Sequence, residues 1–366
     1  MKIGILTHYD VNNQGAQLQL YALYMKLKEM GHTPVVLTYR KNYDFDPALE
    51  RRNQISVKSI PYILKNFLFR KGLGLTWHNV KKYLTNKKFR QTTFQFESYC
   101  LAEIDAAIVG ADEVFSLEIG INMMMFGHGV HTQNLIAYAP SAGQTDMERV
   151  KAFHFEHLMA SGLKSFRFLS VRDKATAALV EGLTGQWPEI VCDPVLLYDF
   201  SLMKIDVKVP SQKYMVVYGY DRHFVDEKEI RVLKAFAKER GLLIVSPGCY
   251  HRWCDRNITC DALQWVELFR RAELIVTDTF HGTIVSVITE RPMAVYVRSK
   301  VNSNKLVDLI RRLGISDRRI NDFSLVELNT IFVRFQDYQV INGHVSKLRQ
   351  EGYAYLENAL QRCQNN

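Results

Sequence analysis

The feature that most constrains the fold of this chain is the alternation of short apolar runs with segments of helical periodicity. Residues 2–7 are typical of a buried strand, 17–30 of an amphipathic helix that Gly31 ends, and 34–39 of a second strand. A strand, a helix and a strand in this order form a unit in which the two strands are parallel. The opening of the chain therefore predicts an α/β protein.

The same alternation continues in two sets of elements. In the first set, the pattern predicts strands at 106–109, 135–139, 166–171 and 190–192 and helices at 146–161 and 173–182. In the second set, it predicts strands at 214–218, 242–245, 274–277 and 293–297 and helices at 226–240, 261–271, 283–289 and 303–313. We therefore expect two doubly wound, Rossmann-like domains, 1–200 and 213–325, that face a ligand cleft. The remaining helical segment, 326–366, is predicted to pack back on the first domain.

The predicted turn at 277–283, in the second domain, combines many polar groups. Ligands of parallel sheets bind beyond the carboxyl ends of strands, and helix N-termini offer free N–H groups to anions. His281 is therefore a candidate proton donor beside a bound anion, with Asp278 predicted to orient its imidazole. Gly282 allows close approach of the backbone to a ligand, and Thr279 and Thr283 supply hydroxyl groups. The alternative is a histidine that only caps or packs the helix.

Other predicted strand ends carry further candidate residues. Polar and glycine residues follow strands of the first domain: His8, Asn13, Gly15, Gln17, Asp112 and Ser141. Arg172 ends another strand, and Arg298 and Lys305 follow the last strand of the second domain. Their cationic groups are suited to a carboxylate or phosphate. For Arg172, an ion pair or a helix-end contact is the alternative.

The composition limits where the protein acts. None of the apolar runs in the 366 residues reaches the length of a membrane span, and the first residues lack a signal-peptide pattern. We expect a cytoplasmic protein, with the inner face of the plasma membrane as a further location. The six cysteines are spread thinly, which is typical of reduced thiols. The cluster around 249–260 lacks zinc-site spacing, so we expect no metal.

The segment 51–96 is strongly basic. It contains eleven Lys and Arg residues and no Asp or Glu, more positive charge than the formal +9 of the whole chain. Large apolar residues are interspersed, as in a basic amphipathic surface that contacts anionic lipid or an anionic, lipid-linked substrate. The alternative is a solvated helical face. No nucleic-acid-binding motif accompanies the charge, so we expect no nucleic acid partner.

Several short fragments occur in a characteristic order. They are NQGAQLQ at 13–19, VGADEV at 109–114, AYAPSAG at 137–143, SVRD at 170–173, DPVLL at 193–197 and TDTFHGT at 277–283. In this order they resemble the polysaccharide pyruvyl transferase family over most of the chain. The resemblance implies a fold similar to that of B-type glycosyltransferases. It also implies transfer of a pyruvyl group from phosphoenolpyruvate to two hydroxyls of a sugar, which gives a cyclic ketal and free phosphate.

The resemblance assigns roles to the candidate residues. His281 is expected to be the general acid, because ketal formation requires protonation of the methylene carbon of the enol phosphate. The second domain is expected to bind the donor through Arg172, Arg298, Lys305, Thr279, Gly282 and Thr283. The first domain is expected to bind the sugar or lipid-linked oligosaccharide acceptor through His8, Asn13, Gly15, Gln17, Asp112 and Ser141. Phosphoenolpyruvate is a co-substrate, and no cofactor is expected.

Some positions depart from the family pattern. Thr279 stands where some members have arginine, and Gln14 stands where an aromatic residue is usual. These departures leave open a different acceptor or a different transfer. Two alternative functions therefore remain: a glycosyltransferase that uses a nucleotide-sugar donor, and a non-catalytic partner in polysaccharide assembly.

Overall fold

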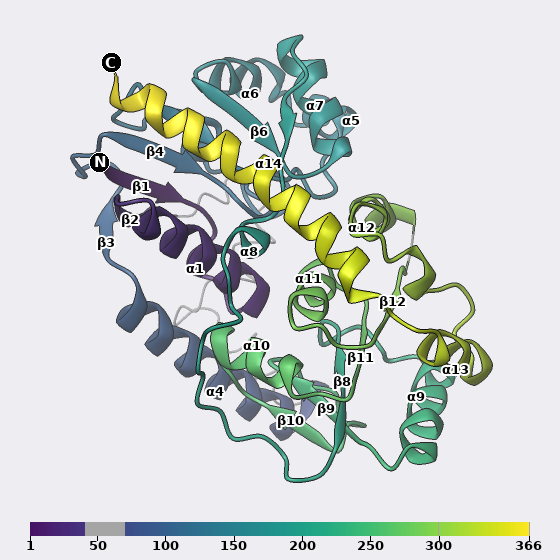
Figure 1. Cartoon of the computed structure of the whole chain (residues 1–366). Helices are drawn as coiled ribbons and strands as arrows, with labels where there is room; N and C mark the ends of the chain where they lie inside the picture. Colours follow the sequence, from purple (N-terminus) through teal and green to yellow (C-terminus); the bar gives the residue numbers. More distant parts are fainter. Residues whose placement is uncertain (41–69, 299, 366) are drawn as a thin grey trace.

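The computed structural model describes residues 1–40, 70–298 and 300–365, which form two lobes around two parallel sheets (Figure 1). Residues 51–69 of the basic segment lie outside the described residues. The first sheet has the order β3-β2-β1-β4-β5-β6-β7. Its strands are β1 (Lys2–Leu6), β2 (Thr33–Thr38), β3 (Phe96–Ser98), β4 (Ala106–Val109), β5 (Leu135–Ala137), β6 (Phe168–Val171) and β7 (Glu189–Ile190).

The second sheet has the order β10-β9-β8-β11-β12-β13, and all of its strand pairs are parallel. Its strands are β8 (Tyr214–Tyr218), β9 (Leu243–Pro247), β10 (Arg256–Ile258), β11 (Leu274–Thr277), β12 (Met293–Tyr296) and β13 (Arg319–Ile320). Thr277 pairs with Tyr218, so the carboxyl ends of β8 and β11 are aligned. The turns that follow these two strands therefore lie at one edge of the sheet.

Helices connect the strands in both lobes. The first lobe contains α1 (Gln14–Glu29), α4 (Arg70–Thr93), η3 (Met123–Phe126), α5 (Met147–Ala152), α6 (Glu156–Leu163), α7 (Lys174–Thr184) and α8 (Pro194–Leu197). The second contains α9 (Glu227–Glu239), α10 (Ala262–Arg270), α11 (Phe280–Ile288), α12 (Lys300–Arg312), η4 (Ser316–Arg318), α13 (Leu325–Val333) and the start of α14 (Tyr338–Gln364). The predicted fold class, two doubly wound α/β domains, is confirmed.

The observed elements depart from the predicted ones in specific places. The predicted helix at 146–161 is two helices, α5 and α6, because His154 between them has a left-handed φ of 54°. Helix α11 begins at Phe280 rather than at 283, so His281 lies within its first turn. The pattern did not predict β3, β10 or β13, which are short strands at sheet edges. Strands this short contain too few residues to show a period.

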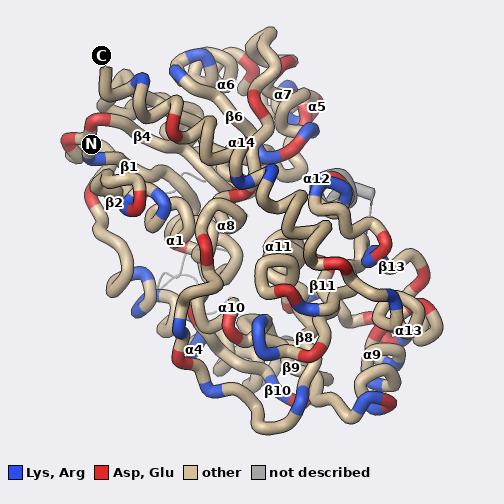
Figure 2. Tube along the Cα trace, in the orientation of Figure 1, with Lys and Arg blue, Asp and Glu red and all other residues tan. Residues whose placement is uncertain are grey.

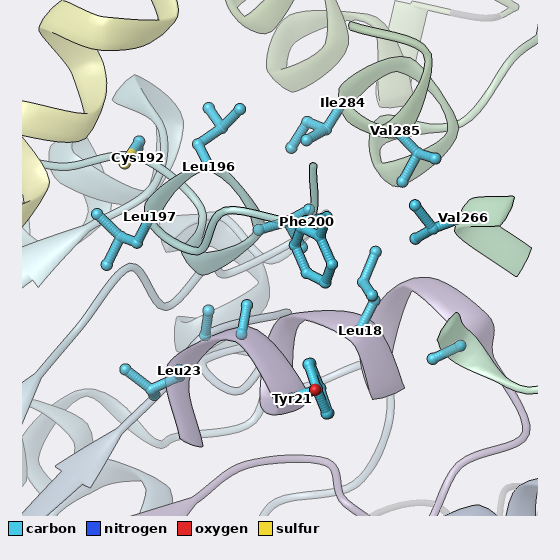
Figure 3. Close-up of a cluster of buried hydrophobic side chains, with 14 of the residues drawn as sticks. Leu18, Tyr21, Leu23, Cys192, Leu196, Leu197, Phe200, Val266, Ile284 and Val285 are labelled. Carbon is cyan, nitrogen blue, oxygen red and sulfur yellow. The ribbon is translucent and has the colours of Figure 1, made fainter. Parts of the chain in front are cut away.

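One hydrophobic cluster joins the two lobes. Figure 3 shows side chains of α1, α8, α10 and α11 pointing toward one another, among them Leu18, Leu196, Val266 and Ile284. All four are essentially inaccessible to solvent. The lobes are therefore held together by packed apolar side chains near the start of α1 and α11.

The last helix, α14, extends along both lobes (Figure 1). Its residue Tyr355 donates a hydrogen bond from Oη to the backbone oxygen of Ala137 at the end of β5, at 3.0 Å. Arg349 donates from Nε to the backbone oxygen of Leu196 at 2.7 Å. The C-terminal segment thus contacts the first lobe. In the part of the chain that the structure describes, no helix is both long and apolar enough to cross a membrane.

Candidate active site

The turn between β11 and α11 is built by its own hydroxyl groups. Thr279 is the N-cap of α11, and its Oγ1 accepts a hydrogen bond from the backbone N–H of Gly282 at 3.0 Å. Thr283 donates from its Oγ1 to the backbone oxygen of Thr279 at 2.9 Å. A Cβ at Gly282 would lie 2.3 Å from Oγ1 of Thr277. The three residues predicted to bind the donor here therefore hold the shape of the turn that carries His281.

His281 lies at the boundary between the lobes. Its residue is 9% exposed. A Cβ at Gly15 of α1 would lie 2.5 Å from Nδ1 of His281, so the ring rests directly on the first turn of α1. On the other side, Nε2 lies 3.3 Å from Oδ2 of Asp193. The imidazole, which projects from the second lobe, is thus enclosed by groups of the first lobe, with a carboxylate against one nitrogen.

The prediction that Asp278 orients His281 needs correction. Asp193, which precedes α8, is the carboxylate that contacts the ring, whereas Asp278 contacts His223 and Arg298. Burial by itself would raise the pKa of Asp193, but the positive charges of His281 and Arg172 outweigh it and lower that pKa. Asp193 is therefore ionised. It belongs to the DPVLL fragment, but nothing in the local sequence indicated that it would face His281.

Arg172 lies behind Asp193. Its Nη1 donates to Oδ2 of Asp193 at 2.8 Å, and its guanidinium lies 4.3 Å from the ring centroid of Phe280. The side chain is almost fully buried, and among the described residues its Nε has no hydrogen-bond partner. The same Oδ2 atom of Asp193 therefore faces both a guanidinium and an imidazole. The alternative considered for Arg172, an ion pair, is therefore observed, and its partner is Asp193.

A narrow cavity of about 10 Å³ adjoins Arg172. Three basic side chains line it, namely those of Arg172, Lys305 and Arg312, together with the carboxylates of Asp193 and Asp308. Arg312 also donates from Nη1 to the backbone oxygen of Arg172 at 3.1 Å. Arg312 was not among the predicted site residues, because a basic residue in the last turn of a helix is common and carries no specific signal.

Lys305 connects the lobes. It projects from α12 of the second lobe and forms an ion pair with Glu113 of the first lobe. Glu113 also lies against Gly143, where a Cβ would be 2.9 Å from its Oε2. A cavity of about 390 Å³, lined by Gly143, Asp173 and other residues, begins beside Lys305. The Lys305–Glu113 pair therefore stands between two cavities at the lobe boundary.

Arg298, the third predicted donor-binding cation, is held by carboxylates of its own lobe. Its Nη1 and Nη2 donate to the two carboxylate oxygens of Glu229, both at 2.9 Å, and its Nε donates to Asp278. The side chain of Asp278 is fully buried, and its Oδ2 lies 2.9 Å from Nδ1 of His223. The structure thus places Arg298 in a chain of contacts with Glu229, Asp278 and His223 rather than in an open anion pocket. His223 and Glu229 were missed because no local pattern marks them.

The residues predicted to bind the acceptor gather at the carboxyl edge of the first sheet. Asn13 caps α1, and Gln17 donates from Nε2 to backbone oxygens of the same loop. His8 contacts Oη of Tyr39 and the backbone oxygen of Glu113, both at 3.3 Å. Ser141 donates from Oγ to Oδ2 of Asp173 at 2.7 Å, and the backbone oxygen of Asp112 accepts from Ser141 N at 2.8 Å. The structure therefore brings these groups together, and many of their hydrogen bonds are made with other groups of the first lobe.

A larger cavity, of about 610 Å³, lies between the start of α4 and loops of the second lobe. Asp221, Tyr250, His251, Arg252 and Trp253 line it with the first turns of α4. Its volume is in the range of small-molecule sites. No local sequence pattern predicts this cavity, because its walls come from distant parts of the chain.

No group of three His, Cys, Asp or Glu side chains is arranged to hold a metal ion within residues 1–40, 70–298 and 300–365. Cys249, Cys254 and Cys260, part of the cluster considered above, are buried.

The chain is similar to known proteins in sequence and in fold. The model of the polysaccharide pyruvyl transferase family matches residues 13–300. Arabidopsis thaliana UGT89C1, solved in complex with UDP-L-rhamnose, has a TM-score of 0.53 at 10% identity, over 99% of this chain and 98% of that one. UDP-GlcNAc 2-epimerase from Neisseria meningitidis, bound to UDP-GlcNAc, has a TM-score of 0.52 at 10% identity, over 99% of this chain and 100% of that one.

At these identities the solved structures show the fold alone, which is that of the two-domain, B-type glycosyltransferases and related epimerases. No curated protein matches the sequence.

Proposed function

The chain belongs to the polysaccharide pyruvyl transferase family, and on that basis we propose that it transfers a pyruvyl group from phosphoenolpyruvate to a sugar. The acceptor is part of a cell-surface polysaccharide or of its lipid-linked precursor. The products are a cyclic pyruvate ketal and phosphate. The observation that supports this best is an imidazole at the lobe boundary whose partner, Asp193, is also bound by Arg172.

The donor is proposed to bind beside Arg172. Phosphoenolpyruvate carries a phosphate and a carboxylate, which are matched by the cations of Arg172, Lys305 and Arg312 around one cavity. About 10 Å³ is room for a single water molecule. Donor binding therefore requires the Lys305–Glu113 pair to separate, which frees a cation for the phosphate. Arg298 is proposed to act on the donor only indirectly, because Glu229 and Asp278 occupy its guanidinium.

His281 is proposed to be the general acid. It gives a proton to the methylene carbon of the enol phosphate, so that the methylene becomes a methyl group and the adjacent carbon becomes an electrophile. The carboxylate of Asp193 lies against Nε2 of the ring and holds the imidazole in place. A first sugar hydroxyl then bonds to the electrophilic carbon, phosphate leaves with its electron pair, and a second hydroxyl closes the ketal. The proton of one hydroxyl leaves with the phosphate and that of the other passes to a base, and exchange of one proton with solvent returns that base and His281 to their starting forms.

His223 is proposed to accept the proton of the attacking hydroxyl. Its Nδ1 faces the buried carboxylate of Asp278, and Arg298 and Glu229 hold that carboxylate in place. The β8 turn that carries His223 lies beside the β11 turn that carries His281, because the two strands are paired with their ends aligned. A histidine in contact with a fixed carboxylate is a common arrangement for a general base.

The acceptor is proposed to lie between the two lobes. The reacting sugar contacts the first-lobe edge, where His8, Asn13, Gly15, Gln17, Asp112 and Ser141 gather. Further sugars of the glycan occupy the 610 Å³ cavity. Asp221 and Trp253 in that cavity offer a carboxylate and an aromatic face, which suit the hydroxyl and C–H surfaces of a sugar.

The proposed activity is tested by phosphate release from phosphoenolpyruvate with a panel of sugar acceptors. His281→Asn should lower the turnover about 10²- to 10⁴-fold, whereas His157→Asn, at an exposed position, should leave it unchanged. Phosphoenolpyruvate at a hundred times its Kd should stabilise both variants by about 2.7 kcal/mol. Stabilisation by nucleoside diphosphates and none by phosphoenolpyruvate would instead establish a glycosyltransferase. Unchanged turnover of His281→Asn would remove His281 from the mechanism.

The role of His223 is tested by His223→Asn. We expect a lower kcat, by about 10²-fold, with an unchanged Kd for phosphoenolpyruvate, because His223 acts on the acceptor. A change in donor Kd with little change in kcat would contradict the assignment.

A further inference from the structure

Helix α4 directs apolar side chains toward solvent. Leu73, Trp77, Val80 and Leu84 are 73%, 62%, 44% and 57% exposed. Their spacing of four, three and four residues places them on one face of the helix. We call these four side chains the α4 ridge. An apolar stripe with this period normally faces a protein core, so its exposure calls for an explanation.

The opposite face of α4, which packs against the protein, is largely polar. His78, Asn86 and Arg90 are buried there. Arg90 lies 3.4 Å from Oδ1 of Asp10, and Phe89 is the large apolar residue of this face that contacts the core. Helix α4 therefore buries its largely polar face and exposes its apolar stripe, which is the opposite of the usual arrangement. The α4 ridge is not needed to attach the helix to the first lobe.

Positive charge surrounds the α4 ridge. Lys81, Lys87 and Lys88 are exposed, and α4 contains no acidic residue (Figure 2). The ammonium group of Lys81 lies 5.1 Å from the ring centroid of Trp77, so charge and apolar surface are in direct contact. The exposed apolar residues of α13 do not have purely basic surroundings like those of the α4 ridge. The acidic residues Glu327, in the same helix, and Asp322 lie near them in sequence.

From these observations we infer that the α4 ridge docks on an anionic lipid bilayer. The apolar side chains enter the boundary between headgroups and acyl chains, where tryptophan is favoured, and the lysines reach lipid phosphates through their flexible stems. The charge complementarity favours an anionic membrane over a neutral one. The contact is peripheral. This inference goes beyond the proposed function, since it concerns the solvent-facing side of α4, and of the four ridge side chains only Leu73 also lines the 610 Å³ cavity.

The test is flotation of the full chain with vesicles of phosphatidylcholine alone or mixed with phosphatidylglycerol. The protein should float with the mixed vesicles, and the bound fraction should fall as salt is added. Lys87→Gln and Lys88→Gln should each lower the partition coefficient about fivefold. Lys151→Gln and Lys164→Gln, exposed on α5 and after α6, should not change it. Equal binding to both vesicle types, or none, would overturn the inference.

The apolar part of the surface needs its own test. The double variant Trp77→Ser/Leu84→Ser should lose vesicle binding, whereas Val333→Ser/Phe335→Ser, at equally exposed positions near α13, should keep it. Mixed vesicles should shift the tryptophan emission of the wild type to shorter wavelength. Trp77→Phe should abolish that shift while binding persists, and Trp187→Phe should retain it. A shift that survives Trp77→Phe, or a Leu84-dependent dimer that forms without lipid, would contradict the inference.

This experiment is independent of turnover. Phosphate release with a water-soluble acceptor should be the same in the Lys87 and Lys88 variants as in the wild type. A protein that binds vesicles and releases no phosphate would refute the proposed function but not the membrane contact of α4. A protein that releases phosphate and does not bind vesicles would refute the membrane contact but not the proposed function.

Discussion

Two buried histidines at the lobe boundary, His281 and His78, differ in what faces them. His281 extends from the second lobe onto Gly15 of the first. His78 extends from α4 of the first lobe toward Tyr250 of the second, with ring centroids 5.6 Å apart. Both are nearly inaccessible to solvent. Their positions are therefore comparable, but among the residues that the structure describes only His281 has a carboxylate within ion-pair distance.

The difference shows how surroundings decide what a buried imidazole can do. Burial lowers the pKa of His78 to about 4, and the positive charge of Lys82 adds to this effect more than Asp221 offsets it. His78 is therefore neutral at physiological pH and has no proton to give. His281 instead has the carboxylate of Asp193 at 3.3 Å from its Nε2. A buried histidine at a lobe boundary is a candidate acid only where such a partner is present.

The largest effect is expected when the partner of His281 loses its charge. Asp193→Asn keeps the side-chain shape and the cap on Val195 N, but it leaves the buried Arg172 without its counter-ion. The free energy of unfolding should fall by about 3–5 kcal/mol, measured by urea denaturation. Asp199→Asn, at an exposed position, should cost about 0.5 kcal/mol or less. Equal stability of the two variants would show that the buried pair is not ionic.

A second prediction uses the lowered pKa of His78. The unfolded chain has the ordinary histidine pKa of about 6.5, whereas the folded value is about 4. Between these values the unfolded chain binds one more proton, so stability is complete above about pH 6.5 and falls as the pH drops toward 4. The loss reaches about 3 kcal/mol.

His78→Gln should remove this part of the pH dependence in urea titrations at several pH values. The part due to His251 and His32, whose pKa values burial also lowers, should remain. His157→Gln serves as the exposed control. A variant with the wild-type profile would mean that the imidazole of His78 is solvated when folded.

A third, smaller effect is expected when one methyl group is added at each of two contacts between the lobes. These are the contact of Gly15 with His281 and the contact of Gly74 with Tyr250. Gly15→Ala places a Cβ 2.5 Å from Nδ1 of His281, so the ring must move. Phosphate release should fall by on the order of 10²-fold, because small displacements of a catalytic group are costly. Gly74→Ala instead meets Tyr250, 2.4 Å from its Oη, on the wall of the 610 Å³ cavity, and should leave turnover with a monosaccharide acceptor unchanged. Equal losses in both variants would indicate a general effect on lobe packing.

The sequence predicted the elements that carry the site well. The predicted strands 214–218 and 274–277 coincide with β8 and β11, because each is a buried apolar run that ends in polar residues. The start of α11 was placed too late, although Thr279 is a residue type that favours the N-cap. Local rules could have located that boundary. They could not have shown that the hydroxyl groups of Thr279 and Thr283 form hydrogen bonds within the turn, because this depends on the final geometry of the backbone.

The sequence by itself therefore determined two parallel α/β lobes and the placement of His281 at a strand end, because periodicity and turn chemistry act over a few neighbouring residues. The tertiary structure alone decided that Asp193, rather than the adjacent Asp278, faces that ring, and that α4 turns its apolar stripe outward. Both outcomes depend on how distant segments pack against one another, and the free energy of such packing is shared among contacts that no local pattern encodes.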